Sequence, residues 1–148
     1  MVAGRTYADW IAVDWGTTNL RAWAMRQDTP VAYAQSDNGM GKLSKSGFEP
    51  ALLDLIDDWL GADQTLVIAC GMVGSRSGWV EAPYAQVPSQ PLSIPTVQAP
   101  SSDPRLVVRV VSGLSQSEPA DVMRGEETQI AGYLRQNQDF DGIISVSY

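Results

Sequence analysis

The chain has 148 residues, of which 44% are hydrophobic and 18% charged, a balance typical of a globular domain. Its net charge of −7 argues against nucleic-acid binding, because that function needs a basic surface to neutralise phosphates. The chain contains no histidine, which excludes a Ser-His-Asp triad and most zinc sites. Any chemistry must therefore use carboxylates, lysine, arginine, hydroxyls and backbone amides, a set that suits phosphoryl transfer.

The sequence favours a soluble, cytoplasmic location. Cys70 is the single cysteine, so no intramolecular disulfide can form. Residues 1–9 lack the apolar core of a signal peptide, and no apolar run approaches the ~20 residues that span a bilayer. We expect no membrane and no nucleic-acid partner, and the sequence leaves the oligomeric state open.

The first predicted elements are three strands joined by short turns, over residues 10–15, 20–25 and 31–35. A loop over residues 37–47 follows, and then a helix over residues 49–60. Leucine, isoleucine and tryptophan recur in that stretch at helical spacing and form one face. A short, fully apolar strand over residues 66–70 has the character of a strand buried in the centre of a sheet.

The second half of the chain alternates between strands and helices after a long excursion. Residues 71–104 are rich in proline, so we expect little regular structure there. A strand over residues 106–111, a helix over residues 126–136 and a strand over residues 143–146 complete the prediction. Three meandering strands followed by alternating helices and strands predict an α/β fold with a ribonuclease-H-like mixed sheet.

The sharpest motif is the turn that joins the first two strands. Asp14 ends the first strand, and Gly16 permits a tight turn and close approach of a ligand. The amides and hydroxyls of Thr17 and Thr18 can point together at an anion, while Asp14 can hold Mg²⁺ through water. Arg21 could neutralise phosphate charge. An ordinary hairpin, with no ligand, is the alternative interpretation.

A second motif, over residues 71–84, follows a buried strand and is rich in glycine. Ligands bind at the carboxyl ends of such strands, so we interpret Gly74, Ser75, Arg76 and Trp79 as a candidate substrate site. Arg76 can grip a carboxylate, and Trp79 can supply a flat wall for a small polyol acid. The alternative interpretation is a glycine-rich connector whose tryptophan covers the core.

A third motif opens the helix predicted over residues 126–136. Acidic side chains in a first helical turn stabilise the helix dipole, and for Glu127 we prefer this explanation. Glu126 is the other acidic side chain of this first turn.

Together these residues resemble a known family. The pattern Asp-x-Gly-Thr-Thr-x-x-Arg, beginning at Asp14, is similar to the first phosphate motif of sugar kinases in the actin-like ATPase superfamily. Residues 71–84 and 124–129 resemble segments typical of 2-dehydro-3-deoxygalactonokinases. The resemblance implies that Asp14, Gly16, Thr17, Thr18 and Arg21 contact the phosphates of ATP and that Asp14 helps to organise Mg²⁺. It also implies that Gly125-Glu126 stands where related kinases carry a Gly-Asp pair that supplies the base. Glu126 is therefore the candidate catalytic base that would orient the substrate hydroxyl, and Glu127, the adjacent carboxylate, is the alternative.

The activity implied by the resemblance is ATP-dependent phosphorylation of 2-dehydro-3-deoxy-D-galactonate to its 6-phosphate. The resemblance ends near Gly142, and the family's proteins are longer. We therefore expect residues 1–148 to be a truncated N-terminal lobe of an actin-like ATPase fold, inactive by itself. A non-catalytic sugar-acid-binding remnant and another sugar kinase of the superfamily are the alternatives. A nuclease using Asp14 and Glu126 is a further alternative, which the negative charge disfavours.

Overall fold

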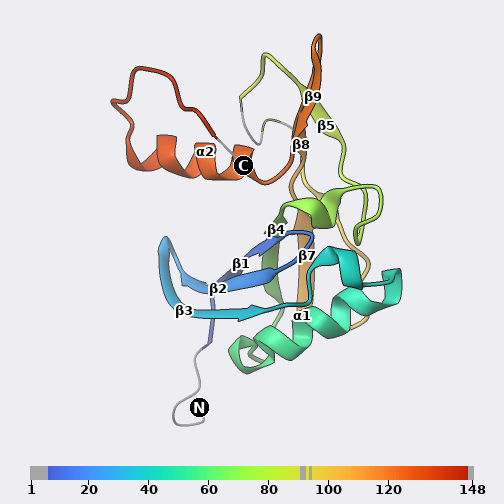
Figure 1. Ribbon diagram of the computed structural model, residues 1–148. Helices are drawn as coiled ribbons and strands as arrows, with labels where there is room; N and C mark the ends of the chain where they lie inside the picture. Colours follow the sequence, from blue (N-terminus) through green and yellow to red (C-terminus); the bar gives the residue numbers. More distant parts are fainter. Residues whose placement is uncertain (1–6, 91–92, 94, 147–148) are drawn as a thin grey trace.

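The computed structural model describes residues 7–90, 93 and 95–146, and a mixed sheet forms its centre (Figure 1). In the described residues this sheet has six strands in the order β3-β2-β1-β4-β7-β6. The meander β1–β2–β3 is antiparallel, β4 and β7 continue parallel to β1, and β6 pairs antiparallel with β7. The strands are β1 (Trp10–Trp15), β2 (Leu20–Arg26), β3 (Thr29–Ser36), β4 (Thr65–Cys70), β6 (Val97–Gln98) and β7 (Leu106–Val110). The predicted meander and mixed α/β class are confirmed.

One face of the sheet packs against helix α1 (Phe48–Ile56). Every second side chain of β1 is buried toward this helix, as the pleat of a strand requires. Phe48 meets Trp15 edge-to-face, with ring centroids 5.4 Å apart. The predicted helix over residues 49–60 is one turn shorter than expected, because Asp57–Trp59 form a 3-10 turn. Acidic side chains at a helix C-terminus oppose the helix dipole, which disfavours continuing the α-helix there.

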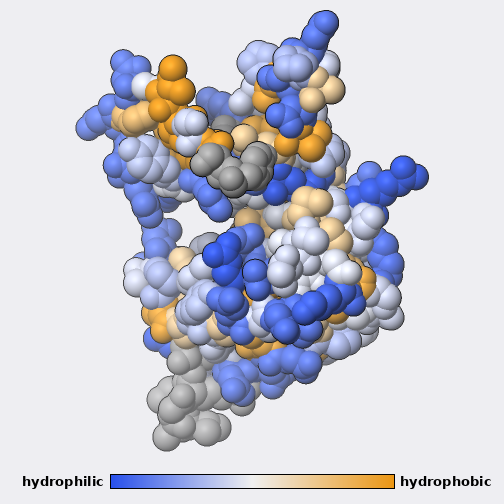
Figure 2. Space-filling model, in the orientation of Figure 1, coloured by the Kyte–Doolittle hydropathy of each residue, from blue (hydrophilic) through white to orange (hydrophobic). Residues whose placement is uncertain are grey.

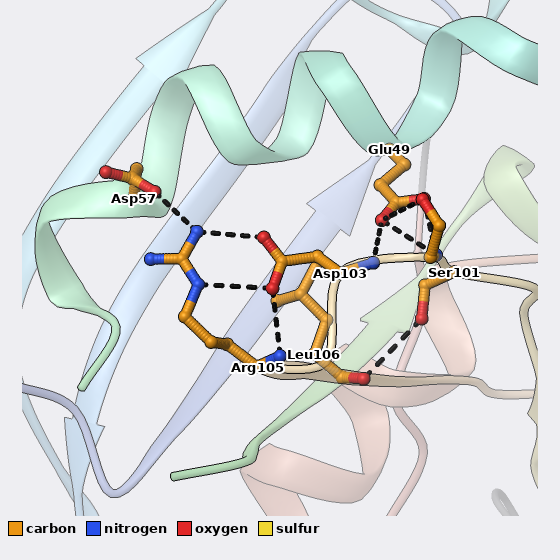
Figure 3. Close-up of polar contacts among 7 residues, drawn as sticks. Glu49, Asp57, Ser101, Asp103, Arg105 and Leu106 are labelled. Carbon is orange, nitrogen blue, oxygen red and sulfur yellow. Dashed lines mark hydrogen bonds and ion pairs between the residues drawn. The ribbon is translucent and has the colours of Figure 1, made fainter. Parts of the chain in front are cut away.

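Polar contacts fix α1 to the loop that precedes β7 (Figure 3). The carboxylate of Glu49 accepts hydrogen bonds from the backbone N–H groups of Ser102 (2.9 Å) and Asp103 (2.7 Å). Arg105 forms ion pairs with Asp57 and Asp103, each at 2.8 Å. The carboxylate of Asp103 accepts hydrogen bonds from the side chain and the backbone N–H of Arg105, and these hold its pKa below its usual range. The end of the proline-rich excursion is therefore ordered by side-chain contacts rather than by regular structure.

A second, smaller sheet was not predicted from the sequence. It has the order β5-β8-β9 and contains β5 (Tyr84–Gln86), β8 (Gly113–Ser117) and β9 (Ala120–Met123). The strands of the β8–β9 hairpin are short and mostly exposed, and they lack the regular apolar alternation that predicts a strand. The loop predicted over residues 37–47 contains two 3-10 turns, Met40–Lys42 and Lys45–Gly47. A further 3-10 turn, Met72–Gly74, begins the excursion.

Helix α2 (Glu126–Gln136) confirms the predicted helix, and it lies on the opposite side of the sheet from α1 (Figure 1). Figure 2 shows open space between α2 and the strands beneath it. Near its end, Arg135 approaches Asp28 of the β2–β3 turn at 3.9 Å, and both side chains are exposed. This exposed ion pair links the far end of α2 to the central sheet.

The strand predicted over residues 143–146 is wrong, because these residues have no regular structure. Ile143 is 93% exposed, and among the described residues no strand lies beside this segment to pair with it. An apolar run forms a strand only where a partner completes its hydrogen bonds. No helix in the described part of the chain is both long and apolar enough to cross a bilayer.

Candidate functional site

The turn between β1 and β2 presents its amides to solvent. The carbonyl oxygens of Gly16 and Thr17 accept hydrogen bonds from the N–H groups of Met40 (2.8 Å) and Gly41 (2.9 Å). The carbonyls therefore point back toward the Met40–Lys42 turn. The N–H groups of Thr17 and Thr18 donate no hydrogen bond within the described residues, and both side chains are exposed. Such an arrangement of free donors fits an anion.

Asp14 and Arg21 face each other across β1 and β2, directly opposite in register. The Arg21 guanidinium donates a hydrogen bond to the Asp14 carboxylate, and both side chains keep solvent access. No group of three candidate metal-ligating side chains occurs among the described residues. A single accessible carboxylate fits Mg²⁺, because this ion retains several waters and takes its other ligands from phosphate oxygens.

Three segments of the chain converge at the carboxyl ends of β1 and β4. Gly71 follows β4 with φ of 98°, and a Cβ atom there would lie 2.8 Å from the carbonyl oxygen of Trp15 and 3.3 Å from Asp14 Oδ1. Gly125, with φ of 120°, would place a Cβ 3.5 Å from Gly71 Cα. At Gly71 the close approach leaves no room for a Cβ atom, and the positive φ of both residues favours glycine. The structure therefore brings the β1–β2 turn, the start of the glycine-rich loop and the start of α2 together.

The two glutamates that open α2 differ sharply in environment. Glu127 is fully buried, and its Oε2 accepts a hydrogen bond from the Gly125 N–H at 2.6 Å. Burial raises the pKa of Glu127, although this hydrogen bond and the nearby Arg124 act in the opposite direction. Glu126 is half-buried, and its carboxylate forms no hydrogen bond with the described residues. Glu126 is thus the glutamate that is free to receive a ligand.

Cys70, at the end of β4, lies near Asp14 and Glu127, and its thiol is a poor nucleophile. Burial, followed by the negative charges of Asp14 and Glu127, raises the pKa of its thiol to about 12. A thiol with such a pKa is protonated near neutral pH, and the thiolate is the nucleophilic form. The cysteine therefore belongs to the packing of the site and not to its chemistry.

The glycine-rich loop places its candidate residues in different environments. Gly74 is buried, and a Cβ atom there would lie 2.7 Å from Nη1 of Arg124. The hydroxyl of Ser75 is buried without a hydrogen-bond partner among the described residues. Arg76 is exposed and forms no ion pair within the described part of the chain. Arg76 is therefore free to meet an incoming carboxylate.

Trp79 lies in the hydrophobic core, which agrees with the alternative interpretation of this loop. It is 4% exposed, its ring stacks on Phe48 with centroids 6.0 Å apart, and its Nε1–H donates to the carbonyl of Pro100 at 3.0 Å. Little of its surface remains for the expected contact with a sugar acid. A groove of about 1160 Å³ lies beside it, between α1 and the loop over residues 100–105, on the α1 side of the sheet.

The sequence did not single out two residues that shape this region. Gly71 is needed where β4 meets the end of β1, and its only signal is its place directly after an apolar strand. Arg124 is 7% exposed and donates to the carbonyl of Ala82 at 2.7 Å. Its signal is its position immediately before Gly125-Glu126 in the third motif.

Comparison with known proteins defines the class. A solved structure described as "Crystal structure of a putative 2-dehydro-3-deoxygalactonokinase protein from Sinorhizobium meliloti" is similar to this chain with a TM-score of 0.73 and 35% identity. The similarity covers 86% of this chain and 43% of that one. Residues 14–147 match the family described as 2-keto-3-deoxy-galactonokinase, and the chain belongs to this family.

Two curated relatives agree with this assignment. The 2-dehydro-3-deoxygalactonokinase of Escherichia coli (strain K12) is 39% identical over 127 residues, which are 84% of this chain and 42% of the relative. "Probable 2-dehydro-3-deoxygalactonokinase DgoK1" of Rhizobium meliloti (strain 1021) is 37% identical over 124 residues, or 82% of this chain and 40% of the relative. The chain therefore spans about two fifths of the length of the curated relatives it matches.

Proposed function

We propose that this chain carries the phosphate turn, the sugar-acid loop and the catalytic base of a kinase that phosphorylates 2-dehydro-3-deoxy-D-galactonate on its terminal hydroxyl. The family and the names of its relatives support the reaction class. The observation that carries the proposal is the convergence of Asp14, Gly71 and Gly125 at one edge of the sheet. Three motifs distant in sequence then serve one reaction.

The phosphate end of the proposed site is the β1–β2 turn. The free N–H groups of Thr17 and Thr18 would bind phosphate oxygens of ATP, and Gly16 keeps the turn tight enough for close approach. Asp14 would hold Mg²⁺ through water. Arg21, which donates to Asp14, would turn its remaining N–H groups toward phosphate. When bound, ATP supplies the phosphoryl group and Mg²⁺ neutralises its charge.

The acceptor end of the proposed site lies between the glycine-rich loop and α2. Arg76 would bind the carboxylate of the sugar acid, and the unpartnered hydroxyl of Ser75 would offer a further hydrogen bond. Gly74 would shape the loop, because its own N–H and carbonyl pair with Gly71 and Ala82. Glu126 would accept the proton of the terminal hydroxyl and orient it for in-line attack. We assign the base to Glu126 because the Glu127 carboxylate is buried against Gly125.

We also propose that the six-stranded sheet with α1 is a ribonuclease-H-like unit and forms one lobe of an actin-like ATPase fold. The support is the antiparallel meander followed by two parallel strands in the order β3-β2-β1-β4-β7.

Calorimetric titration of the purified chain with 2-dehydro-3-deoxy-D-galactonate tests the acceptor site. We expect saturable heat that is lost in Arg76→Ala and kept in Arg135→Ala, a matched control on an exposed arginine of α2. The C4 epimer, 2-dehydro-3-deoxy-D-gluconate, reports the stereochemical preference. Absence of heat from a folded chain, or equal binding by Arg76→Ala, would contradict the proposed acceptor site.

A further inference from the structure

Arg124 is a buried cation that no acidic side chain of the described residues neutralises by direct contact. Its Nη2 donates to the carbonyl of Ala82 at 2.7 Å, and its Nε donates to the hydroxyl of Tyr84 at 3.3 Å. The guanidinium carbon lies 4.2 Å from the centre of the Tyr84 ring. Burying a charge is costly unless its environment satisfies it, so this arrangement needs a reason.

The contacts of Arg124 join two parts of the proposed site. Ala82 and Tyr84 belong to the far end of the glycine-rich loop, whereas the backbone of Arg124 leads directly into Gly125 and Glu126. The guanidinium also passes over Gly74, where a Cβ would lie 2.7 Å from Nη1. Glycine at this position is therefore what allows the arginine to cross the loop.

We infer that Arg124 is a positioning residue that clamps the loop over residues 71–84 to the first turn of α2. The clamp makes the candidate carboxylate ligand, Arg76, and the candidate base, Glu126, move as one unit. The catalytic role of the clamp rests on the proposed function, whereas the clamp itself follows from the contacts of Arg124 with Ala82 and Tyr84. Nη1, which is buried without a partner among the described residues, is the part of the guanidinium nearest Gly74.

The clamp requires a guanidinium and not merely a positive charge. A planar guanidinium can donate in two directions while its face lies on an aromatic ring, whereas a lysine ammonium is a compact point charge. Arg124→Lys therefore keeps the charge and loses the combination of contacts with Ala82 and Tyr84. Tyr84→Leu removes the hydroxyl and ring contacts from the other side, but it keeps the arginine and its hydrogen bond to the Ala82 carbonyl. It provides a second variant should Arg124→Lys fail to fold.

Hydrogen exchange of the 148-residue chain, read by peptide, tests the clamp without requiring a ligand. In Arg124→Lys and in Tyr84→Leu we expect exchange to accelerate by about tenfold or more in both segments, 71–84 and 124–130. Strands β1 and β4 should exchange as in the unchanged chain, and Arg76→Ala should leave both segments unaltered. Acceleration in only one segment, no acceleration in either, or uniform acceleration that includes β1 and β4 would overturn the inference.

A second readout separates positioning from structural support. Saturating 2-dehydro-3-deoxy-D-galactonate should slow exchange in both segments of the unchanged chain, but only in residues 71–84 of Arg124→Lys. Equal ligand protection of both segments in Arg124→Lys would overturn the coupling. If the ligand protects neither segment of the unchanged chain while the two variants loosen both, the proposed function fails and the clamp stands.

Discussion

The backbone N–H of Gly125 donates a hydrogen bond of 2.6 Å to the carboxylate of Glu127, which is fully buried. Gly125 has φ of 120°, a conformation that favours glycine, and the next residue is Glu126. The buried carboxylate thus helps to fix the backbone immediately before the candidate base. Glu127 thus holds the start of the helix, whereas the carboxylate of Glu126 is free to receive a ligand.

Glu127→Gln should change stability in a pH-dependent manner. Burial raises the pKa of Glu127, so the folded chain favours the protonated, neutral side chain. The stability that this side chain contributes is fully present at a pH below the ordinary pKa of glutamate, and it is lost as the pH rises through the raised pKa of the folded state. Glutamine stays neutral, and the stability of the variant relative to the unchanged chain should therefore increase from pH 4 to pH 7.5. Urea unfolding at both pH values measures this. Glu126→Gln is the matched control. The account would be contradicted if the difference in unfolding free energy between Glu127→Gln and the unchanged chain were the same at both pH values.

Gly71→Ala should be destabilising, because Gly71 has φ of 98° and a Cβ would lie 2.8 Å from the Trp15 carbonyl. The expected loss is ~1–3 kcal/mol, the cost of holding a non-glycine residue in a disfavoured conformation. Gly132→Ala is the control, since Gly132 lies within α2 and a Cβ there meets nothing within 4 Å. It should stabilise the chain by ~0.5–1 kcal/mol through helix propensity. If thermal unfolding showed the same change in stability for both variants, the close approach of Gly71 to the Trp15 carbonyl would be contradicted.

Trp79→Ala should cost ~3–5 kcal/mol of unfolding free energy, as expected when a buried aromatic side chain is removed. Tyr33→Ala is the comparison, because Tyr33 is 52% exposed and should cost much less. Denaturant unfolding with both variants measures the difference. If Trp79→Ala were as mild as Tyr33→Ala, then Trp79 would be available as a ligand wall.

Asp14→Asn should separate metal binding from stability. Its ion pair with Arg21 is accessible to solvent, so the loss of unfolding free energy should stay below ~1 kcal/mol. Calorimetric titrations with ATP, with and without Mg²⁺, should show that the variant loses the Mg²⁺-dependent part of nucleotide binding. Asp28→Asn, on the exposed β2–β3 turn, is the control. Retention of the Mg²⁺ effect in Asp14→Asn would remove Asp14 from the metal site.

The sequence predicted strands β1, β2, β3, β4 and β7 of the central sheet because they have strong local signals. It did not predict β6, which has two residues and lies in the proline-rich excursion. Residues 10–15 and 66–70 are apolar and rich in β-forming side chains, and short turns join the first three strands. The β8–β9 hairpin could not be recognised, since its strands are short and lack a regular apolar alternation. The strand expected over residues 143–146 failed for the opposite reason: its residues are apolar, but pairing depends on a neighbour that local sequence cannot reveal.

The candidate site was predictable where a motif is local and unpredictable where it depends on packing. The turn after Asp14 could be read from consecutive residues. The different environments of Glu126 and Glu127 could not, because burial depends on which side of α2 meets Gly71. The same limit applies to Trp79, whose place beside Phe48 joins segments that are distant in sequence.

The measurement that tests the central claim most directly is a titration of the isotope-labelled chain with 2-dehydro-3-deoxy-D-galactonate, followed by backbone amide NMR shifts. The account predicts shifts in both residues 71–78 and residues 125–128, since these segments meet at the carboxyl ends of β1 and β4. The groove between α1 and residues 100–105 is the competing location. Shifts confined to Lys45, Glu49 and residues 100–105 would contradict the proposed site.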